Sequence, residues 1–87
     1  MTSRTTARFW ECFARLPADV QTAARARYRL WERDPFHPSL HFKQVAPDLW
    51  SARINVQYRA LARRRGDVVA WFWIGTHNDY DKLISRP

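Results

Sequence analysis

The first third of the chain carries apolar residues at helical spacing. Phe9, Cys12, Phe13 and Leu16 recur at steps of three or four residues, which is the period of one helix face. This spacing predicts a helix from about Thr5 to Arg15. The hydroxyl groups of the residues before it, MTSRTT, could cap the start of this helix.

A second helix is predicted after Pro17, which breaks the first helix and suits the first turn of the next. Asp19 then lies in that first turn, where the helix dipole favours a carboxylate. The helix ends at Asp34-Pro35, because the residue before a proline disfavours helical backbone. The apolar face of this helix comprises Val20, Ala24, Tyr28 and Trp31.

The second half of the chain changes to the spacing of strands. Leu40 to Val45 is predicted as a short strand, and Trp50 to Val56 alternates apolar with polar residues, so that one side faces a core. Tyr58 to Arg63 is its hairpin partner, and Val68 to Ile74, apolar on both faces, is a covered strand. The chain is therefore predicted to be α+β. An N-terminal helical hairpin packs on a three- to four-stranded antiparallel sheet, and a short C-terminal turn or helix follows.

The turn at Arg65-Gly66 sets the predicted register of the last hairpin. With a two-residue loop, Ala60 lies opposite Trp71. Ala62 then lies opposite Val69, so small residues face large ones on the side that meets the helices. The other face mixes arginines with an aromatic ring, which makes a poor core but suits nucleic acid. It carries Arg53, Arg59, Leu61, Arg63 and Phe72.

Composition narrows the class of protein and partner. The 87 residues are predicted to form one domain, residues 1–87, with a formal net charge of +7. Thirteen of the fifteen basic residues are arginine, which suits phosphates and carboxylates, so the partner is expected to be nucleic acid or an acidic protein. The single Cys12 excludes a disulfide framework and a cysteine-based metal site. Without a signal peptide or a long apolar run, the protein is expected to be cytoplasmic and away from membranes.

Several segments carry a resemblance to a known family. They are WSARI (50–54), YRALA (58–62) and WIGTH (73–77) with a tyrosine three residues on, together with the upstream segment LPADVQTAARARYRLWERDPFHPSLHFK. Over nearly its whole length the chain resembles the RelE/ParE toxin superfamily of bacterial toxin–antitoxin systems. Many members open with an edge strand, and the resemblance implies that MTSRTT is a weak version of one, as the alternative to a helix cap. That superfamily includes both ribosome-dependent mRNA endonucleases and gyrase poisons, so the resemblance implies a toxin of one of these kinds.

The resemblance implies catalytic residues on the last strands. The endonucleases of the superfamily cleave RNA through its own 2′-OH, without a metal or another cofactor. Arg53 matches the basic residue at the end of the WSARI-type strand, and Arg59 matches the arginine of the next strand. His77 matches the basic or imidazole position after the last strand, and Tyr80 lies near the family's C-terminal tyrosine.

The same positions can be argued from their chemistry. Two arginines on neighbouring strands repel one another unless an anion lies between them, although either could form a surface salt bridge with Asp79 or Asp81. His77 can exchange protons near neutral pH, or it can simply be a hydrogen-bonded surface residue. The resemblance adds Lys43, which matches a basic residue that contacts RNA in some members, and His41 is predicted on the same strand face as Lys43. Arg63 and Phe72, on the open face of the sheet, are also expected to contact nucleic acid.

One departure from the family bears on the mechanism. Some endonucleases of the superfamily use a glutamate as the proton acceptor, and this chain has no glutamate after Glu32. His41 or His77 would have to take its place. A metal site at the HNDYD segment (77–81) matches no metal-loop spacing and is not favoured.

The sequence therefore favours a type II toxin that cleaves mRNA on the ribosome. An acidic cognate antitoxin is expected to neutralise it, either by covering Arg53 and Arg59 or by displacing the last helix. Two alternatives stay open: a gyrase inhibitor of the ParE kind, which needs only a binding surface, and an inactive homologue that acts as a binding module.

Overall fold

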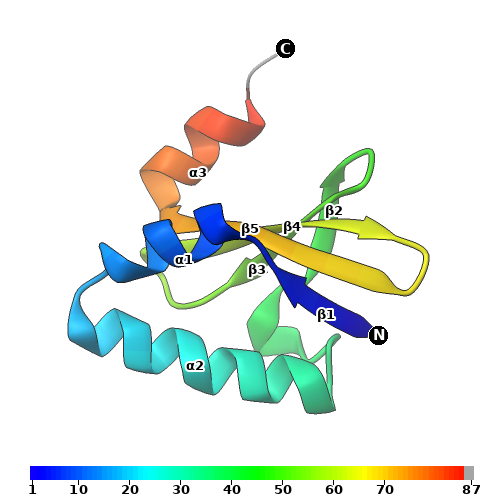
Figure 1. The fold of residues 1–87 in the computed structure, drawn as a ribbon, viewed down its shortest axis with the longest axis horizontal. Helices are drawn as coiled ribbons and strands as arrows, with labels where there is room; N and C mark the ends of the chain where they lie inside the picture. Colours follow the sequence, from blue (N-terminus) through cyan, green and yellow to red (C-terminus); the bar gives the residue numbers. More distant parts are fainter. Residues whose placement is uncertain (86–87) are drawn as a thin grey trace.

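The computed structural model describes residues 1–85, in which helices lie on both sides of a five-stranded sheet. Figure 1 shows α2 on one side of the sheet and α3 on the other. The elements in chain order are β1 (Thr2–Thr5), α1 (Ala7–Ala14), α2 (Ala18–Arg33), a 3₁₀ turn (Pro38–Leu40), β2 (Lys43–Ala46), β3 (Leu49–Arg53), β4 (Tyr58–Arg65), β5 (Val68–Thr76) and α3 (His77–Ile84). The predicted α+β class and the N-terminal helical hairpin are confirmed.

The sheet has one more strand than predicted, and it is mixed. The strand order is β1-β5-β4-β3-β2, in which β1 pairs with β5 in parallel and every other pair is antiparallel. Both alternatives for the N-terminal residues hold together, because Thr2–Thr5 is an edge strand and the Thr6 hydroxyl accepts from the Phe9 amide at 3.2 Å. Thr6 is the N-cap of α1, so the chain turns from strand to helix within one residue.

The predicted register of the last hairpin is wrong by two residues. Arg65 pairs with Val68, so the loop consists of Gly66 and Asp67, and Gly66 takes a left-handed backbone with φ of 58°. Ala62 consequently lies opposite Trp71, and a bulge after Leu61 follows. Between the turn and the bulge, this shift of two residues leaves the side chains on their predicted faces, because side chains alternate with a period of two. Beyond the bulge the shift is three residues, so that Ala60 lies opposite Ile74 and Trp73 joins Leu61 on the face away from Trp71.

The segment before β2 also differs from the prediction. Pro38–Leu40 forms a 3₁₀ turn, helped by the His37 Nδ1 atom, which accepts from the Ser39 amide at 3.2 Å. His41 follows with a left-handed φ of 46°, and β2 begins only at Lys43. His41 is therefore not on the strand that carries Lys43, and the prediction that they share a strand face is wrong.

The strand β3 ends earlier than the alternation indicated. It stops at Arg53, and the Asn55 side chain accepts from the amides of Gln57 and Tyr58, which turns the chain into β4. Val56, predicted as the last core residue of the strand, is 69% exposed on this turn. The polar side chain of Asn55 therefore decides the turn in place of the apolar period.

The main core lies between the sheet and the first two helices. Trp31 of α2 meets Trp71 of β5 edge-on, with ring centroids 5.3 Å apart, and small residues on β4 make room for these rings. Arg27, which interrupts the apolar face of α2, donates from Nε to the Ile54 carbonyl at 3.2 Å. Buried residues of this cluster include Phe13, Ala24, Trp31, Leu40, Phe42, Ala52, Ala60, Ala62 and Trp71.

The opposite face of the sheet is less open than predicted. Leu61, Trp73 and Tyr80 form a second buried cluster, in which α3 contributes Tyr80. The C-terminal element is thus a helix seated on the sheet, and the charged residues lie around this small core. Among residues 1–85, no helix has the length and the apolar character needed to cross a membrane.

Candidate functional site

The two arginines that the sequence singled out face each other across neighbouring strands. Arg53 of β3 pairs with Arg59 of β4, and Arg59 pairs in turn with Gly75 of β5. Both arginines are half-buried. Arg53 lies two residues after Ser51 on β3, so both side chains are on the same face of the sheet. The Ser51 hydroxyl accepts a hydrogen bond from Tyr80 of α3, so the arginine pair belongs to the face that α3 covers.

The guanidinium of Arg59 is held by backbone. Its Nη1 atom donates to the carbonyl of Asn55 and to the carbonyl of Tyr58, at 3.0 Å in the second case. Burial lowers the pKa of Arg59 from its ordinary value, and the nearby charge of Arg53 lowers it further, while Tyr80 and Asp81 act in the opposite direction. An arginine still keeps its charge at neutral pH, so the site holds two cations that an anion between them would stabilise.

Gly75 makes the space beside this pair. A Cβ atom at this position would lie 2.5 Å from Cζ2 of the Trp73 ring, so only glycine lets the ring lie over the backbone here. Because Gly75 pairs with Arg59, the Trp73 ring lies on the strand next to the Arg53–Arg59 pair.

His77 begins α3 immediately beyond this pair. Its backbone amide donates to the Gln57 carbonyl at 2.7 Å, which fixes the start of the helix against the β3–β4 turn. Its Nδ1 atom lies 3.0 Å from Asp81 Oδ2, one helical turn later, and the imidazole remains 42% exposed. With the proton on Nδ1 facing Asp81, Nε2 is left as the nitrogen that can accept a proton.

Asp81 is the residue whose role the sequence did not show. The sequence allows a salt bridge between Asp81 and the arginines, but within residues 1–85 neither Arg53 nor Arg59 forms an ion pair, and Asp81 faces His77 instead. The spacing of four residues is the available signal. It places the two side chains together only if the segment is helical, and a helix was one of two predicted alternatives there.

Tyr80 is placed as a packing residue. Its ring is only 6% exposed, within the cluster of Leu61 and Trp73, and its hydroxyl donates to Ser51 Oγ at 3.2 Å. The ring of His77 meets it edge-on at 5.6 Å. Tyr80 therefore anchors α3 and supports His77, and it would have to leave Ser51 before its hydroxyl could take part in proton transfer.

The residues predicted to contact nucleic acid are only partly brought together. Lys43 pairs with Ser51, which places it on the α3 face, and it is exposed. The Arg63 guanidinium lies 5.2 Å from the centre of the Phe72 ring. His41 is exposed, but it lies before the strand. Among residues 1–85, no group of three or more His, Cys, Asp and Glu side chains gathers as metal ligands would.

Comparisons with known proteins agree with this geometry. The ParE-like toxin domain matches residues 18–82 of the chain. The chain belongs to the ParE-like toxin family. It is thus a toxin of the toxin–antitoxin kind, as the resemblance had implied. No curated protein sequence matches the chain significantly.

Solved structures of toxins share the fold. A YoeB/ParE toxin from Agrobacterium tumefaciens superposes with a TM-score of 0.68 at 20% identity, covering 88% of this chain and 99% of that one. The toxin–antitoxin complex RelBE2 from Mycobacterium tuberculosis gives 0.69 at 21%, covering 87% and 90%. A copper-bound mutant toxin from Helicobacter pylori gives 0.59 at 13%, covering 91% and 97%.

Proposed function

We propose that this toxin cleaves mRNA on the ribosome by attack of the RNA's own 2′-OH on the adjacent phosphodiester. The observation that carries the proposal is the cross-strand pair Arg53–Arg59 with the His77–Asp81 pair beside it. The arginines supply positive charge for a phosphorane-like transition state, and the imidazole is oriented by a carboxylate as a proton acceptor.

The proposed step balances without a metal. The 2′-OH gives its proton to His77 Nε2 while its oxygen forms a bond to phosphorus. The bond from phosphorus to the 5′-oxygen breaks, and that oxygen takes a proton from solvent. The products are a 2′,3′-cyclic phosphate and a 5′-hydroxyl end. Arg53 and Arg59 bind the non-bridging phosphate oxygens, which gain charge along the way.

The partners follow from the charge and the family. A net charge of +7 favours RNA backbone and an acidic protein over neutral partners. One of the structural neighbours was solved as a toxin–antitoxin complex, and we propose that an acidic antitoxin neutralises this chain too. Because ribosomes are the proposed target, we propose that the protein acts in the cytoplasm.

A gyrase inhibitor is the second candidate. The match to the ParE-like domain favours it, because ParE toxins poison gyrase. The contacts of Arg59 also favour it, because the guanidinium already donates hydrogen bonds to two backbone carbonyls and is less free to bind a phosphate. A gyrase inhibitor would need the surface of the protein but no proton transfer at His77.

Pulse labelling after induced expression separates the two candidates. Incorporation of labelled amino acids and of labelled thymidine is followed in the same culture, and the 5′ ends of mRNA are mapped. We expect protein synthesis to stop first and new 5′ ends to appear within coding regions. If DNA synthesis stops first while protein synthesis continues and no new ends appear, the gyrase function replaces the proposal.

A further inference from the structure

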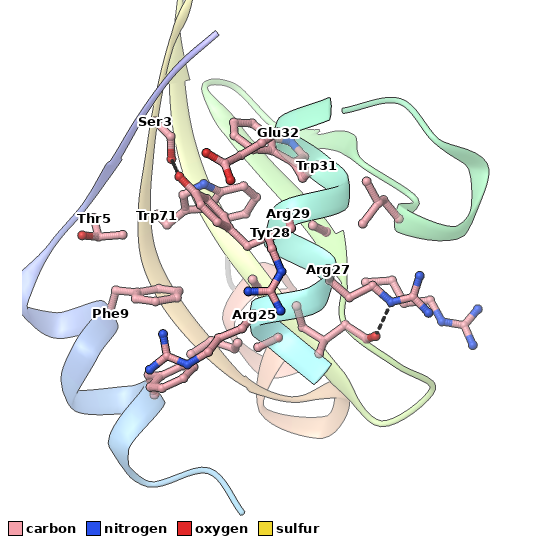
Figure 2. A pocket seen from close by; sticks show the side chains of 18 of the residues that line it. Ser3, Thr5, Phe9, Arg25, Arg27, Tyr28, Arg29, Trp31, Glu32 and Trp71 are labelled. Carbon is pink, nitrogen blue, oxygen red and sulfur yellow. Dashed lines mark hydrogen bonds between the residues drawn. The ribbon is translucent and has the colours of Figure 1, made fainter. Parts of the chain in front are cut away.

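A hollow of about 520 Å³ lies between the two N-terminal helices and the sheet, away from the His77–Asp81 pair. Its walls come from β1, α1 and α2, and its floor from β3, β4 and β5 (Figure 2). The volume is in the range of pockets that hold small organic molecules. The α3 helix does not contribute to it.

Two tryptophans that line the hollow, Trp31 of α2 and Trp71 of β5, carry indole N–H donors without acceptors. Trp31 and Trp71 are 3% and 4% exposed, and neither indole nitrogen has a hydrogen-bond partner among residues 1–85. A buried donor without an acceptor costs about 1–3 kcal/mol. Two such donors on neighbouring rings are therefore unfavourable unless an acceptor can reach them.

Tyr28 spans the hollow above this floor. Its ring stacks on Trp31 with centroids 5.9 Å apart, and its hydroxyl donates to Ser3 Oγ at 2.7 Å, which links α2 to β1. Figure 2 shows Tyr28 reaching from α2 to Ser3 of β1. Tyr28 is also 37% exposed, so a ligand can displace it without opening the core.

The residues around the hollow are strongly cationic. They include five arginines and a single acidic residue, Glu32. The Arg25 guanidinium lies 4.9 Å from the centre of the Phe13 ring, and Arg29 also lines the wall. Neither arginine forms an ion pair within the described chain. This excess of positive charge favours an anionic occupant and disfavours a second copy of this chain, which is also at +7.

We propose that this hollow binds a small organic carboxylate with an apolar body. The apolar body packs on the Trp31 and Trp71 rings, in the space next to Phe9. The carboxylate meets Arg25 and Arg29, and its two oxygens have enough lone pairs to accept also from an indole N–H once Tyr28 moves aside. The hollow shares Arg53 with the proposed cleavage site, but the carboxylate meets Arg25 and Arg29, so this binding does not depend on the cleavage of RNA.

The direct test is a titration with decanoate, below its micelle concentration, followed by the side-chain N–H signals of the five tryptophans in an NMR spectrum. Single Trp→Phe variants assign the signals. We expect saturable shifts of the Trp31 and Trp71 signals. The signal of Trp73, which lies under α3, should not shift. Decanol, which has the same body without the charge, should bind at least about tenfold more weakly.

Two exposed arginines provide matched variants. Arg25→Gln should weaken decanoate binding by about three- to tenfold, whereas Arg65→Gln, at the far end of the β4–β5 hairpin, should leave it unchanged. Equal binding of decanol, equal shifts at Trp73, or no saturable shift would each overturn the proposal. So would an acidic protein partner that moves the Trp31 and Trp71 signals while decanoate moves neither, because the hollow would then be a protein interface.

Discussion

The two faces of the sheet are built on different principles. The face toward α1 and α2 sets large rings against small residues, as with Trp71 opposite Ala62, and most of its side chains are buried. The face toward α3 has a core of only Leu61, Trp73 and Tyr80, with a row of cations beside it. The first face stabilises the domain. The second face holds two positive charges close together, which lowers the free energy of unfolding.

The pKa of Arg59 shows the cost of that second arrangement. Burial and Arg53 place its pKa below the ordinary value, so between the two values the unfolded chain binds more protons and stability rises with pH. At neutral pH both states are protonated, and the full cost of burying the charge is present. A site that keeps such a cost is expected to bind an anion.

The largest effect on stability is expected on the face toward α1 and α2. Trp71→Ala should destabilise the domain by about 3–5 kcal/mol, because it removes a buried ring that contacts Trp31 and Phe42. That is a large share of the ~5–15 kcal/mol of a small domain. Thermal and urea unfolding measure it. Phe36→Ala, at a ring that is 57% exposed, is the control that should unfold near the wild type. Equal melting of both variants would show that this face is not the main core.

On the α3 face, His77→Gln should act on the reaction and hardly on the fold. Glutamine keeps a hydrogen bond to Asp81 but cannot accept the 2′-OH proton, so cleavage should slow by about 10²–10⁴-fold. An exposed pair of this kind contributes at most about 1 kcal/mol to stability. The measurement is single-turnover mRNA cleavage on programmed ribosomes at matched occupancy. Unchanged rates would make His77 a structural residue of the α3 start.

The smallest effect is expected at the anchor of α3. Tyr80→Phe removes the hydrogen bond to Ser51 Oγ but keeps the buried ring, so stability should fall by about 1 kcal/mol. Hydrogen exchange of the α3 amides should increase more than exchange in β4. Equal increases throughout the domain would show that the hydroxyl stabilises the whole fold and not the seating of α3.

The cross-strand pair was predictable because it depends on local alternation. Arg53 and Arg59 flank a short turn, and few registers place both on the polar side of their strands. The last hairpin was harder, since choosing between Arg65-Gly66 and Gly66-Asp67 as the loop requires knowing which residue takes the left-handed backbone. Next to the turn the error is two residues, so the predicted faces hold there, but the bulge after Leu61 adds a third residue and puts Trp73 on the α3 face.

The remaining differences come from contacts between distant segments. The strand β1 is short and polar, and it is recognisable only by its parallel pairing with β5, some 66 residues later in the chain. The position of α3 beside the Arg53–Arg59 pair depends on the hydrogen bond from Tyr80 to Ser51, which is 29 residues away in the sequence. The position of His41 depends on a 3₁₀ turn that its neighbours Pro38 and His37 impose. No periodicity in the sequence reports these contacts.

The central claim is that the Arg53–Arg59 pair binds the reacting phosphate. Arg59→Ala tests it most directly, with Arg65→Ala as the matched control on the same strand. Both variants should unfold close to the wild type, since neither opens a cavity in the core. We predict that Arg59→Ala lowers the single-turnover rate of ribosome-dependent mRNA cleavage by about 10²-fold or more and abolishes toxicity, while Arg65→Ala retains both. A folded Arg59→Ala protein that cleaves and kills as the wild type does would contradict the account.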